Sequence, residues 1–366
     1  MFDLVSSANQ QVNNVHNFFE LFGKAAIVII SLLVLNIIVP VIWLFIVRPS
    51  LPWRSKLKAT NGSWAIITGC TDGIGLAFAK KLADKGFNLC LISRSQSKLE
   101  DLKKNLLSRY CLCGKVEILA FDFSSTDYKI VEEKIKSLPR VNLLINNVGI
   151  VPGTFDPPVD YFTQTGRDIV FKALKVNILS CTRMTNIVLP IMESQKSGTI
   201  LNLSSIFGTR SSPLFSVYGA TKTFVDFFGR ALKLECSSKG IRVQTLTPCL
   251  VQTSMAKMET NITVPKADEF VESVFRTFAI DTRTTGFWSH QVMYRSGALL
   301  SVLSPFEYWQ DRATLSRVAD EMDELKRELN IPFEPHAFQT DIFSFLIDKF
   351  GLLVRSATDK DSPIQK

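Results

Sequence analysis

The sequence is poor in the residues that build metal sites. It contains three histidines in 366 residues, and its seven cysteines include no C-x-x-C pair. Tetrahedral zinc sites are made from closely spaced cysteines and histidines, so we expect no bound metal ion. The cysteines also lack the spacing of a disulfide framework. We therefore expect reduced, packed thiols in a domain that faces the cytosol.

Basic runs and low-complexity tracts are missing as well. The formal net charge is +8, but the lysines and arginines are scattered along the chain. Nucleic-acid binding requires basic residues gathered into a patch, so we expect no nucleic-acid partner. Small anionic molecules such as phosphate esters suit a dispersed positive charge. Hydrophobic residues make up 46% of the chain, which is enough for a substantial core and argues against disorder.

One long uncharged run follows an N-terminal segment of residues 1–24. Residues 25–47 are apolar apart from Ser31 and Asn36, and a bilayer requires about 20 such residues. A cleaved signal peptide is a poorer interpretation, because the run is too long and starts too late. A buried core helix is the other alternative. The linker 48–62 carries Arg48, Arg54, Lys56 and Lys58, whereas the only lysine or arginine in residues 1–24 is Lys24. We therefore expect one membrane pass with the C-terminal part in the cytosol.

Beyond this linker the pattern alternates between apolar runs and helical periodicity. The predicted strands are 64–68, 87–92, 116–121, 141–146, 199–204 and 241–247. Near-continuous apolar strands separated by helices are typical of a parallel sheet covered on both faces. We predict an α/β fold with a doubly wound, parallel Rossmann-type sheet over residues 63–285.

Residues 286–366 form a predicted C-terminal extension. Its first part, 287–309, is rich in aromatic residues but interrupted by charge. It is predicted to lie at the membrane surface, to cover an apolar substrate tunnel, or to pack as an ordinary subdomain. A charged helix over 318–330 and an amphipathic segment over 338–354 follow.

A glycine-rich turn joins the first predicted strand to the first predicted helix. The turn has the spacing G-x-x-x-G-x-G, and its candidate cofactor-binding residues are Gly69, Thr71, Asp72, Gly73, Ile74 and Gly75. Glycines at these positions permit a tight turn, close approach of the backbone to a pyrophosphate, and close helix packing. The alternative is a glycine-rich turn without a ligand, which the strand-turn-helix context disfavours.

The end of the second predicted strand indicates which dinucleotide binds. An NAD enzyme usually places an acidic residue here, whereas this sequence has Ser93 and Arg94, followed by Lys98. A guanidinium can form a bidentate contact with a 2′-phosphate, so we predict NADPH or NADP as the cofactor. The alternative is that Arg94 and Lys98 only solvate a loop.

A tyrosine and a lysine lie four residues apart in a segment with helical periodicity. The heads of Tyr218 and Lys222 therefore share one helix face. A phenol exchanges protons poorly at neutral pH, and a nearby ammonium favours the phenolate. Ser205 lies thirteen positions before Tyr218 and is near enough along the chain to hold a carbonyl oxygen beside the phenol. This set suits carbonyl reduction, although a lone Tyr-x-x-x-Lys is common by chance.

Together with the turn Asn146-Asn147-x-Gly149, these motifs resemble the short-chain dehydrogenase/reductase family. Within that family the sequence is most similar to the membrane-bound 17β-hydroxysteroid dehydrogenase type 12 group, the very-long-chain 3-oxoacyl-CoA reductases. The resemblance implies that the catalytic residues are Asn177, Ser205, Tyr218 and Lys222. In this scheme Asn177 holds a water that relays protons to Lys222.

The resemblance also implies further contacts with the cofactor. Asp122 would contact adenine, and the adenosine ribose would be lined by Asn146, Asn147 and Gly149. Val251 and Thr253 would lie near the nicotinamide, and Tyr218 and Lys222 would contact the second ribose. The Pro-Gly that usually follows the sixth strand is here Pro248-Cys249. That departure leaves open whether the nicotinamide side keeps its usual geometry and whether the protein is active.

The implied function is NADPH-dependent reduction of a very-long-chain 3-oxoacyl-CoA during fatty-acid elongation. The implied place is the endoplasmic reticulum membrane, with membrane lipid and a small lipid substrate as partners; a homodimer and association with other elongation enzymes are also compatible. The same group includes proteins that act on 17-ketosteroids, and others that are non-catalytic and only bind. Retention of Ser205, Tyr218 and Lys222 argues against the non-catalytic alternative.

Overall fold

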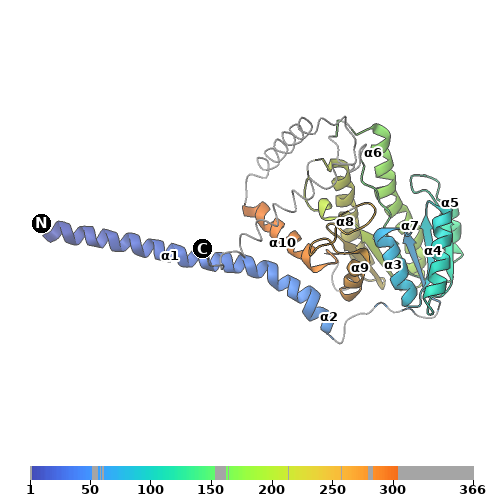
Figure 1. Ribbon diagram of the computed structural model, residues 1–366, viewed down its shortest axis with the longest axis horizontal. Helices are drawn as coiled ribbons and strands as arrows, with labels where there is room; N and C mark the ends of the chain where they lie inside the picture. The colour runs from blue at the N-terminus through green and yellow to red at the C-terminus, as the bar shows by residue number, and fades with distance from the viewer. Residues whose placement is uncertain are drawn as a thin grey trace, which may run out of the picture.

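The fold is built around one parallel sheet. The computed structural model describes residues 2–51, 57, 59, 62–152, 162–163, 165–212, 214–256, 258–278 and 283–303. In this part of the chain seven strands lie in the order β3-β2-β1-β4-β5-β6-β7, with helices on both faces (Figure 1). The strand order reverses between β1 and β4, and ligands of such sheets bind beyond the carboxyl ends of the strands at this position. The predicted doubly wound α/β fold is confirmed.

The central strands are buried on both sides, as their apolar sequences predict. The strands are β1 (Trp64–Thr68), β2 (Asn88–Ser93), β3 (Val116–Ala120), β4 (Val141–Asn146), β5 (Gly198–Leu203), β6 (Ile241–Leu246) and β7 (Arg283–Thr284). Every residue of β1 and of β5 is buried. Six strands match the predicted ranges to within one residue. The two-residue strand β7 is absent from the prediction.

Helices divide the core into two layers. One layer is covered by α3 (Gly73–Asp84), α4 (Gln96–Arg109) and α9 (Ala267–Arg276), and the other by α5 (Lys129–Lys136), α7 (Ser180–Ser194) and α8 (Ser216–Cys236). Before α7, the chain forms α6 (Arg167–Leu174) and the π-helical turn η2 (Lys175–Leu179), and a short 3-10 turn, η3 (Ile206–Gly208), precedes α8. The two layers fix the strand ends that carry the site.

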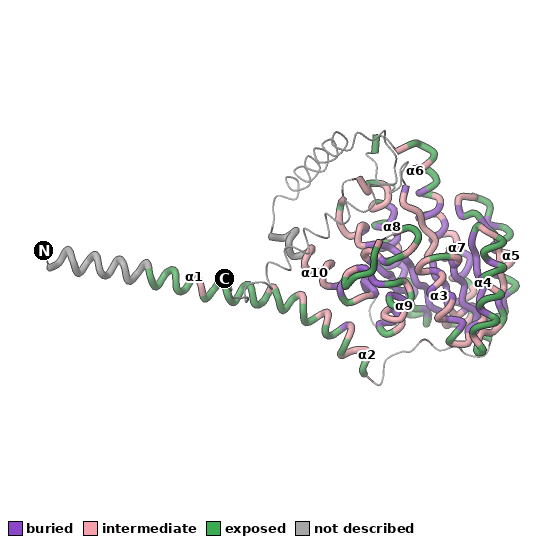
Figure 2. Tube along the Cα trace, viewed as in Figure 1, coloured by how far each residue is buried: buried purple, intermediate pink, exposed green. Residues whose placement is uncertain are grey.

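A long helix leads into the sheet domain. Helix α1 (Phe2–Ile42) continues through the π-helical turn η1 (Trp43–Val47) into α2 (Arg48–Ser50). His16–Ser50 is the one helical segment among the described residues that is long and apolar enough to cross a membrane. Most of its residues are exposed, with Leu32 61% exposed (Figure 2). It is therefore a candidate membrane span, and it includes the predicted run 25–47.

The start of the C-terminal extension forms a helix that packs against α1. Helix α10 (Trp288–Leu303) contacts α1, and Ser289, His290 and Gln291 in its first turn are buried. The predicted helix 318–330 and the predicted amphipathic segment 338–354 lie outside the described residues.

Candidate active site

The glycine turn between β1 and α3 has left-handed backbone where the sequence predicts it. Gly69 has φ +65° and Gly73 has φ +53°, conformations that cost glycine little. A Cβ at Gly73 would lie 2.8 Å from the Thr253 Cγ2, so only glycine, which has no Cβ, fits at this position. A Cβ at Gly75 would collide with the Gly69 carbonyl oxygen. The first two glycines shape a cradle, and the third permits close packing.

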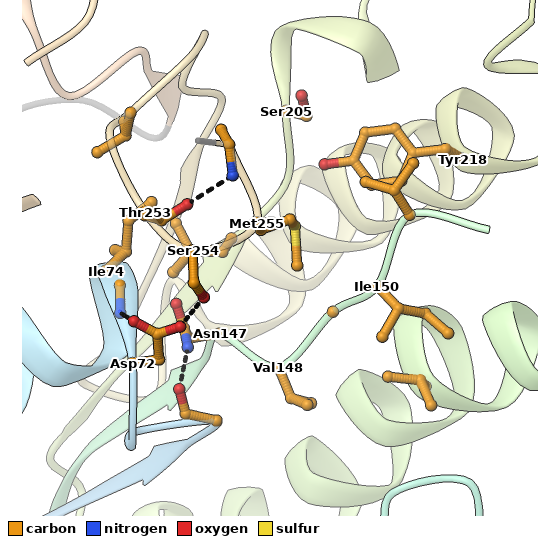
Figure 3. Close-up of a pocket in the computed structure, with 18 of the residues that line it drawn as sticks. Asp72, Ile74, Asn147, Val148, Ile150, Ser205, Tyr218, Thr253, Ser254 and Met255 are labelled. Atoms are coloured by element: carbon orange, nitrogen blue, oxygen red, sulfur yellow. Dashed lines mark hydrogen bonds between the residues drawn. The ribbon is translucent and has the colours of Figure 1, made fainter. Parts of the chain in front are cut away.

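Two polar side chains hold this cradle. The Asp72 carboxylate caps α3 by accepting a hydrogen bond from the Gly73 amide at 2.6 Å, and it also accepts one from the Ser254 hydroxyl. Directly after β4, the Asn147 side chain donates to the carbonyl oxygens of Thr68 at 2.9 Å and Gly69 at 3.0 Å. Figure 3 shows these side chains around one cavity. The helix end and its dipole thus face the position of a pyrophosphate.

The side of the cavity beyond β2 and β3 carries charge. The Thr71 and Ser93 hydroxyls are 2.9 Å apart, and the exposed Arg94 lines the cavity beside them. The pKa of Asp122 is lowered, first by a hydrogen bond from the Ser124 backbone amide and further by the charges of Arg94 and Lys172. Lys98 is exposed on α4 and does not line the cavity.

Ser205, Tyr218 and Lys222 line the same cavity. Ser205 follows β5, while α8 carries the other two on one face, as their spacing predicts. The Lys222 ammonium donates to the Leu203 carbonyl oxygen at 3.0 Å and lies 5.7 Å from the centroid of the Tyr218 ring. The Ser205 hydroxyl oxygen accepts a hydrogen bond from the Phe207 amide at 3.3 Å, which leaves its own proton free for another acceptor. The Tyr218 hydroxyl points into the cavity (Figure 3).

Burial controls the protonation of this group. It raises the pKa of Tyr218, against a smaller lowering effect of the Ser205 hydroxyl. It also lowers the pKa of Lys222 to about 8. The pKa of Tyr218 therefore shifts in the direction opposite to the lowering expected from Lys222, because burial removes the hydration that a phenolate needs. Tyr218 is therefore a protonated phenol at neutral pH.

Asn177 and Asn146 are placed beside the cavity but do not line it. Asn177 lies in η2, accepts a hydrogen bond from the Ile150 amide at 2.8 Å, and donates to the Ile150 carbonyl and the Thr221 hydroxyl. It therefore fixes the backbone that follows β4. The buried Asn146 amide donates to Thr185 and Asn202, so the predicted ribose contact of its side chain is not available in this arrangement.

The connection from β6 to α9 covers the cavity. Val251 is buried, Thr253 lines the cavity, and the Thr253 hydroxyl accepts a hydrogen bond from the Ala256 amide at 3.1 Å. At Pro248-Cys249, which replaces the Pro-Gly usual in the family, the Cys249 amide donates to His290 Nδ1 at 3.3 Å. The His290 Nε2 lies 3.0 Å from the Thr263 carbonyl oxygen. Burial lowers the pKa of His290 to about 4. The neutral His290 ring, from α10, thus holds the connection between β6 and α9 in place.

Several lining residues were not predicted. Lys172 of α6 lines the cavity on the Asp122 side, and Phe207, Phe215 and Met255 line the part near Tyr218. Phe207 and Phe215 stack with ring centroids 4.6 Å apart. Their place between Ser205 and Tyr218 in the sequence is a signal that points to the substrate side. For Lys172 the sequence holds no comparable signal, because its position depends on how α6 packs.

Most of the predicted residues therefore meet in one cavity of about 430 Å³. Those that line it are Gly69, Thr71, Asp72, Gly73, Ile74, Ser93, Arg94, Asp122, Asn147, Gly149, Ser205, Tyr218, Lys222, Val251 and Thr253. Gly149 is tight against the site, since a Cβ there would lie 3.1 Å from the Lys222 Nζ. Within the described ranges, no group of three or more His, Cys, Asp or Glu residues is arranged to hold a metal ion.

Comparisons with known proteins agree with this geometry. A family model described as short chain dehydrogenase matches residues 63–262. A protein of Mus musculus named very-long-chain 3-oxoacyl-CoA reductase is 38% identical over 253 residues, which cover 68% of this chain and 78% of that protein. A protein of Homo sapiens named inactive hydroxysteroid dehydrogenase-like protein 1 is 37% identical over 253 residues, covering 67% and 74%. A solved short-chain dehydrogenase from Sphingobium yanoikuyae in complex with NADPH has a TM-score of 0.56 and 27% identity, covering 66% of this chain and 96% of that one.

Proposed function

Since the chain belongs to the short-chain dehydrogenase family, we propose that it uses NADPH to reduce a ketone to a secondary alcohol. One observation carries this proposal: Ser205, Tyr218 and Lys222 line the cavity that the glycine turn also lines. A proton donor and a dinucleotide cradle in one cavity are what carbonyl reduction requires.

The residues present fit a nicotinamide dinucleotide. Gly69 and Gly73 leave space that a Cβ would fill, beside the first turn of α3. Arg94 lines the cavity next to the Ser93 hydroxyl, where a guanidinium suits a 2′-phosphate. The solved relative from Sphingobium yanoikuyae, in complex with NADPH, supports the same cofactor. When bound, the cofactor supplies the hydride.

The chain's own residues would manage the proton and the carbonyl oxygen. The Ser205 hydroxyl, which already accepts from the Phe207 amide, has a proton to donate to the substrate oxygen. Tyr218 holds the proton to be transferred, because burial raises the pKa of its phenol. Lys222 stays mostly protonated near neutral pH and stabilises the phenolate after transfer. Asn177 is a positioning residue, since its amide fixes the backbone of Ile150.

We propose a very-long-chain 3-oxoacyl-CoA as the substrate. The Mus musculus relative carries that name, and Phe207, Phe215 and Met255 give the catalytic end of the cavity apolar walls. A 17-ketosteroid is the competing substrate, because it also suits an apolar wall. The human relative named inactive favours a third candidate, a protein that only binds; the presence of Tyr218 and Lys222 in the cavity argues against it.

We further propose that the protein resides in the endoplasmic reticulum membrane, with its catalytic domain in the cytosol. The candidate span in α1 and the basic residues after it support this orientation.

Parallel turnover assays test the proposed function. Purified full-length protein would be given NADPH or NADH with either a long 3-oxoacyl-CoA or a 17-ketosteroid, and the alcohol product identified. We expect the 3-hydroxyacyl-CoA, formed faster with NADPH. If NADPH binds but neither ketone is reduced, the binding-only candidate replaces the reductase.

A further inference from the structure

A second cavity lies between the end of the candidate span and the catalytic domain. Its volume is about 290 Å³. One wall comes from α1, η1 and α2, and the other from α10 and from the chain at the ends of β6 and β7. It shares no lining residue with the active-site cavity. Leu44 in η1 is 8% exposed and Trp43 is 50% exposed, so this turn presents one face to the catalytic domain.

Three arginines line this cavity: Arg48, Arg283 and Arg295. Among its described lining residues there is no aspartate or glutamate. Arg283 is neutralised from behind by the buried Asp226, with 3.1 Å between Nε and Oδ1, and it also donates to the Tyr294 hydroxyl at 2.9 Å. The cavity is therefore a positive one, and it suits an anion that can accept several hydrogen bonds.

Arg295 is the residue that most needs such an anion. Its Nε is buried and has no hydrogen-bond partner among the described residues. A buried donor without a partner is costly, and the cost is larger for a charged group. Gln291 and Tyr294, from the same face of α10, add neutral hydrogen-bonding groups to the wall that Arg295 lines.

The place of the cavity along α1 identifies the source of the anion. Its lining includes Pro40, Trp43 and Leu44 in the last turns of the candidate span, followed by Arg48 at the first polar turn. The Arg48 guanidinium lies 5.9 Å from the Trp43 ring centroid. Tryptophan and arginine in this order are typical of the level at which lipid headgroups meet the hydrocarbon core.

We propose that this cavity binds the phosphate of an anionic glycerophospholipid, held by Arg48, Arg283 and Arg295. The lipid tails would follow the apolar surface of α1, and the headgroup would join the span to α10. The proposal rests on the membrane insertion proposed for α1, but not on the substrate or on the reductase chemistry. It adds to the protein a lipid site separate from catalysis.

The test measures lipid binding by the full-length protein in a neutral detergent. Native mass spectrometry would follow the retention of phosphatidylserine and of phosphatidylcholine. We expect one tightly retained phosphatidylserine, and for Arg295→Gln a loss of affinity of about tenfold or more, which corresponds to about 1.4 kcal/mol. Arg109→Gln at the exposed end of α4 makes the same charge change away from the cavity and should retain the lipid.

Arg48→Gln repeats the test with a residue outside the catalytic domain. If Arg295→Gln misfolds, the lipid affinity of Arg48→Gln still tests the proposal. NADPH binding to each variant confirms that the active-site cavity is intact. Equal retention of the two lipids, or unchanged retention in both Arg295→Gln and Arg48→Gln, overturns the proposal. Displacement of the lipid by coenzyme A or inorganic phosphate at equal concentration overturns it too, and assigns the cavity to a soluble phosphate ester. In each case, ketone reduction by the wild-type protein in the same detergent judges the proposed function separately.

Discussion

At the residue scale, the proposed chemistry depends on one phenol proton. Tyr218→Phe removes the Oη that would donate to the alkoxide, so we expect turnover to fall by roughly 100-fold or more, a typical loss for a general acid. NADPH affinity should stay nearly unchanged, because the ring and Lys222 are kept. The measurement is kcat with separate titration of NADPH. Tyr110→Phe, at the end of α4 and away from the cavity, is the matched control. Residual activity within about tenfold of wild type would end the assignment of Tyr218 as the acid.

Arg94 is expected to determine cofactor preference at the same scale. Arg94→Ala should weaken NADPH much more than NADH, since a guanidinium in this place would contact only the 2′-phosphate. Dissociation constants for both cofactors check this expectation. Lys98→Ala is a suitable control, because Lys98 is exposed on α4 and does not line the cavity. Equal losses for the two cofactors in Arg94→Ala would mean that Arg94 does not bind that phosphate.

His290 links stability to pH. Its pKa is about 4 in the folded protein, while an exposed histidine has a pKa near 6.5. Above pH 6.5 the histidine is neutral in both the folded and the unfolded protein, so it takes nothing from the free energy of unfolding. As the pH falls below 6.5, the unfolded protein binds a proton that the folded protein does not, and the free energy of unfolding decreases. The decrease ends once the pH passes the folded pKa of about 4. We expect a loss of about 2 kcal/mol at pH 5.

The variant His290→Gln isolates this effect, because an amide can also accept from Cys249 and donate to Thr263 but does not titrate. Denaturation of both proteins near pH 7 and near pH 5 should show a drop for wild type that the variant lacks. A parallel drop in both proteins would place the titration on another group.

At the element scale, the sequence predicts well those parts whose signal is local. Six strands and the helix that carries Tyr218 and Lys222 follow from continuous apolar runs and from helical spacing. Strand β7, in contrast, has two residues and pairs with β6 only because the chain returns there. The positions of Lys172 and His290 also depend on tertiary packing, because these residues reach the site only through the packing of α6 and α10. Asn146 shows the converse, since its turn is predicted correctly while its amide bonds to Asn202 in the neighbouring strand.

Helix α1 should determine membrane attachment and orientation. Deletion of residues 1–50 removes the candidate span, so we expect less protein to stay with the membrane after a carbonate wash. Protease added to intact microsomes should digest the catalytic domain if it faces the cytosol. The sequence Asn261-Ile262-Thr263 is an exposed N-glycosylation sequon and offers an independent check. The sequon that starts at Asn202 is fully buried and should carry no glycan in either orientation. A glycan on Asn261 or full protection from protease would reverse the orientation.

At the scale of the whole molecule, the two cavities and the span suggest how a lipid substrate is handled. The candidate span would hold the domain at the bilayer, the anionic-lipid cavity would fix α10 against that span, and His290, in the first turn of the same helix, braces Cys249 at the active site. In this arrangement membrane composition would influence the catalytic connection through one helix. The substrate would then come from the bilayer rather than from bulk solvent.

The substrate proposal makes the last prediction. If an acyl chain lies along the apolar walls formed by Phe207, Phe215 and Met255, each buried methylene adds about 0.8 kcal/mol. We therefore expect kcat/KM to increase with acyl length, by up to about fourfold per methylene, until the chain leaves the apolar surface. A series of 3-oxoacyl-CoA esters assayed in one detergent, with the 3-hydroxyacyl-CoA product identified, gives this dependence. No dependence on length, together with efficient reduction of a 17-ketosteroid, would move the assignment to the steroid, because a rigid ring system gains nothing from a longer apolar path.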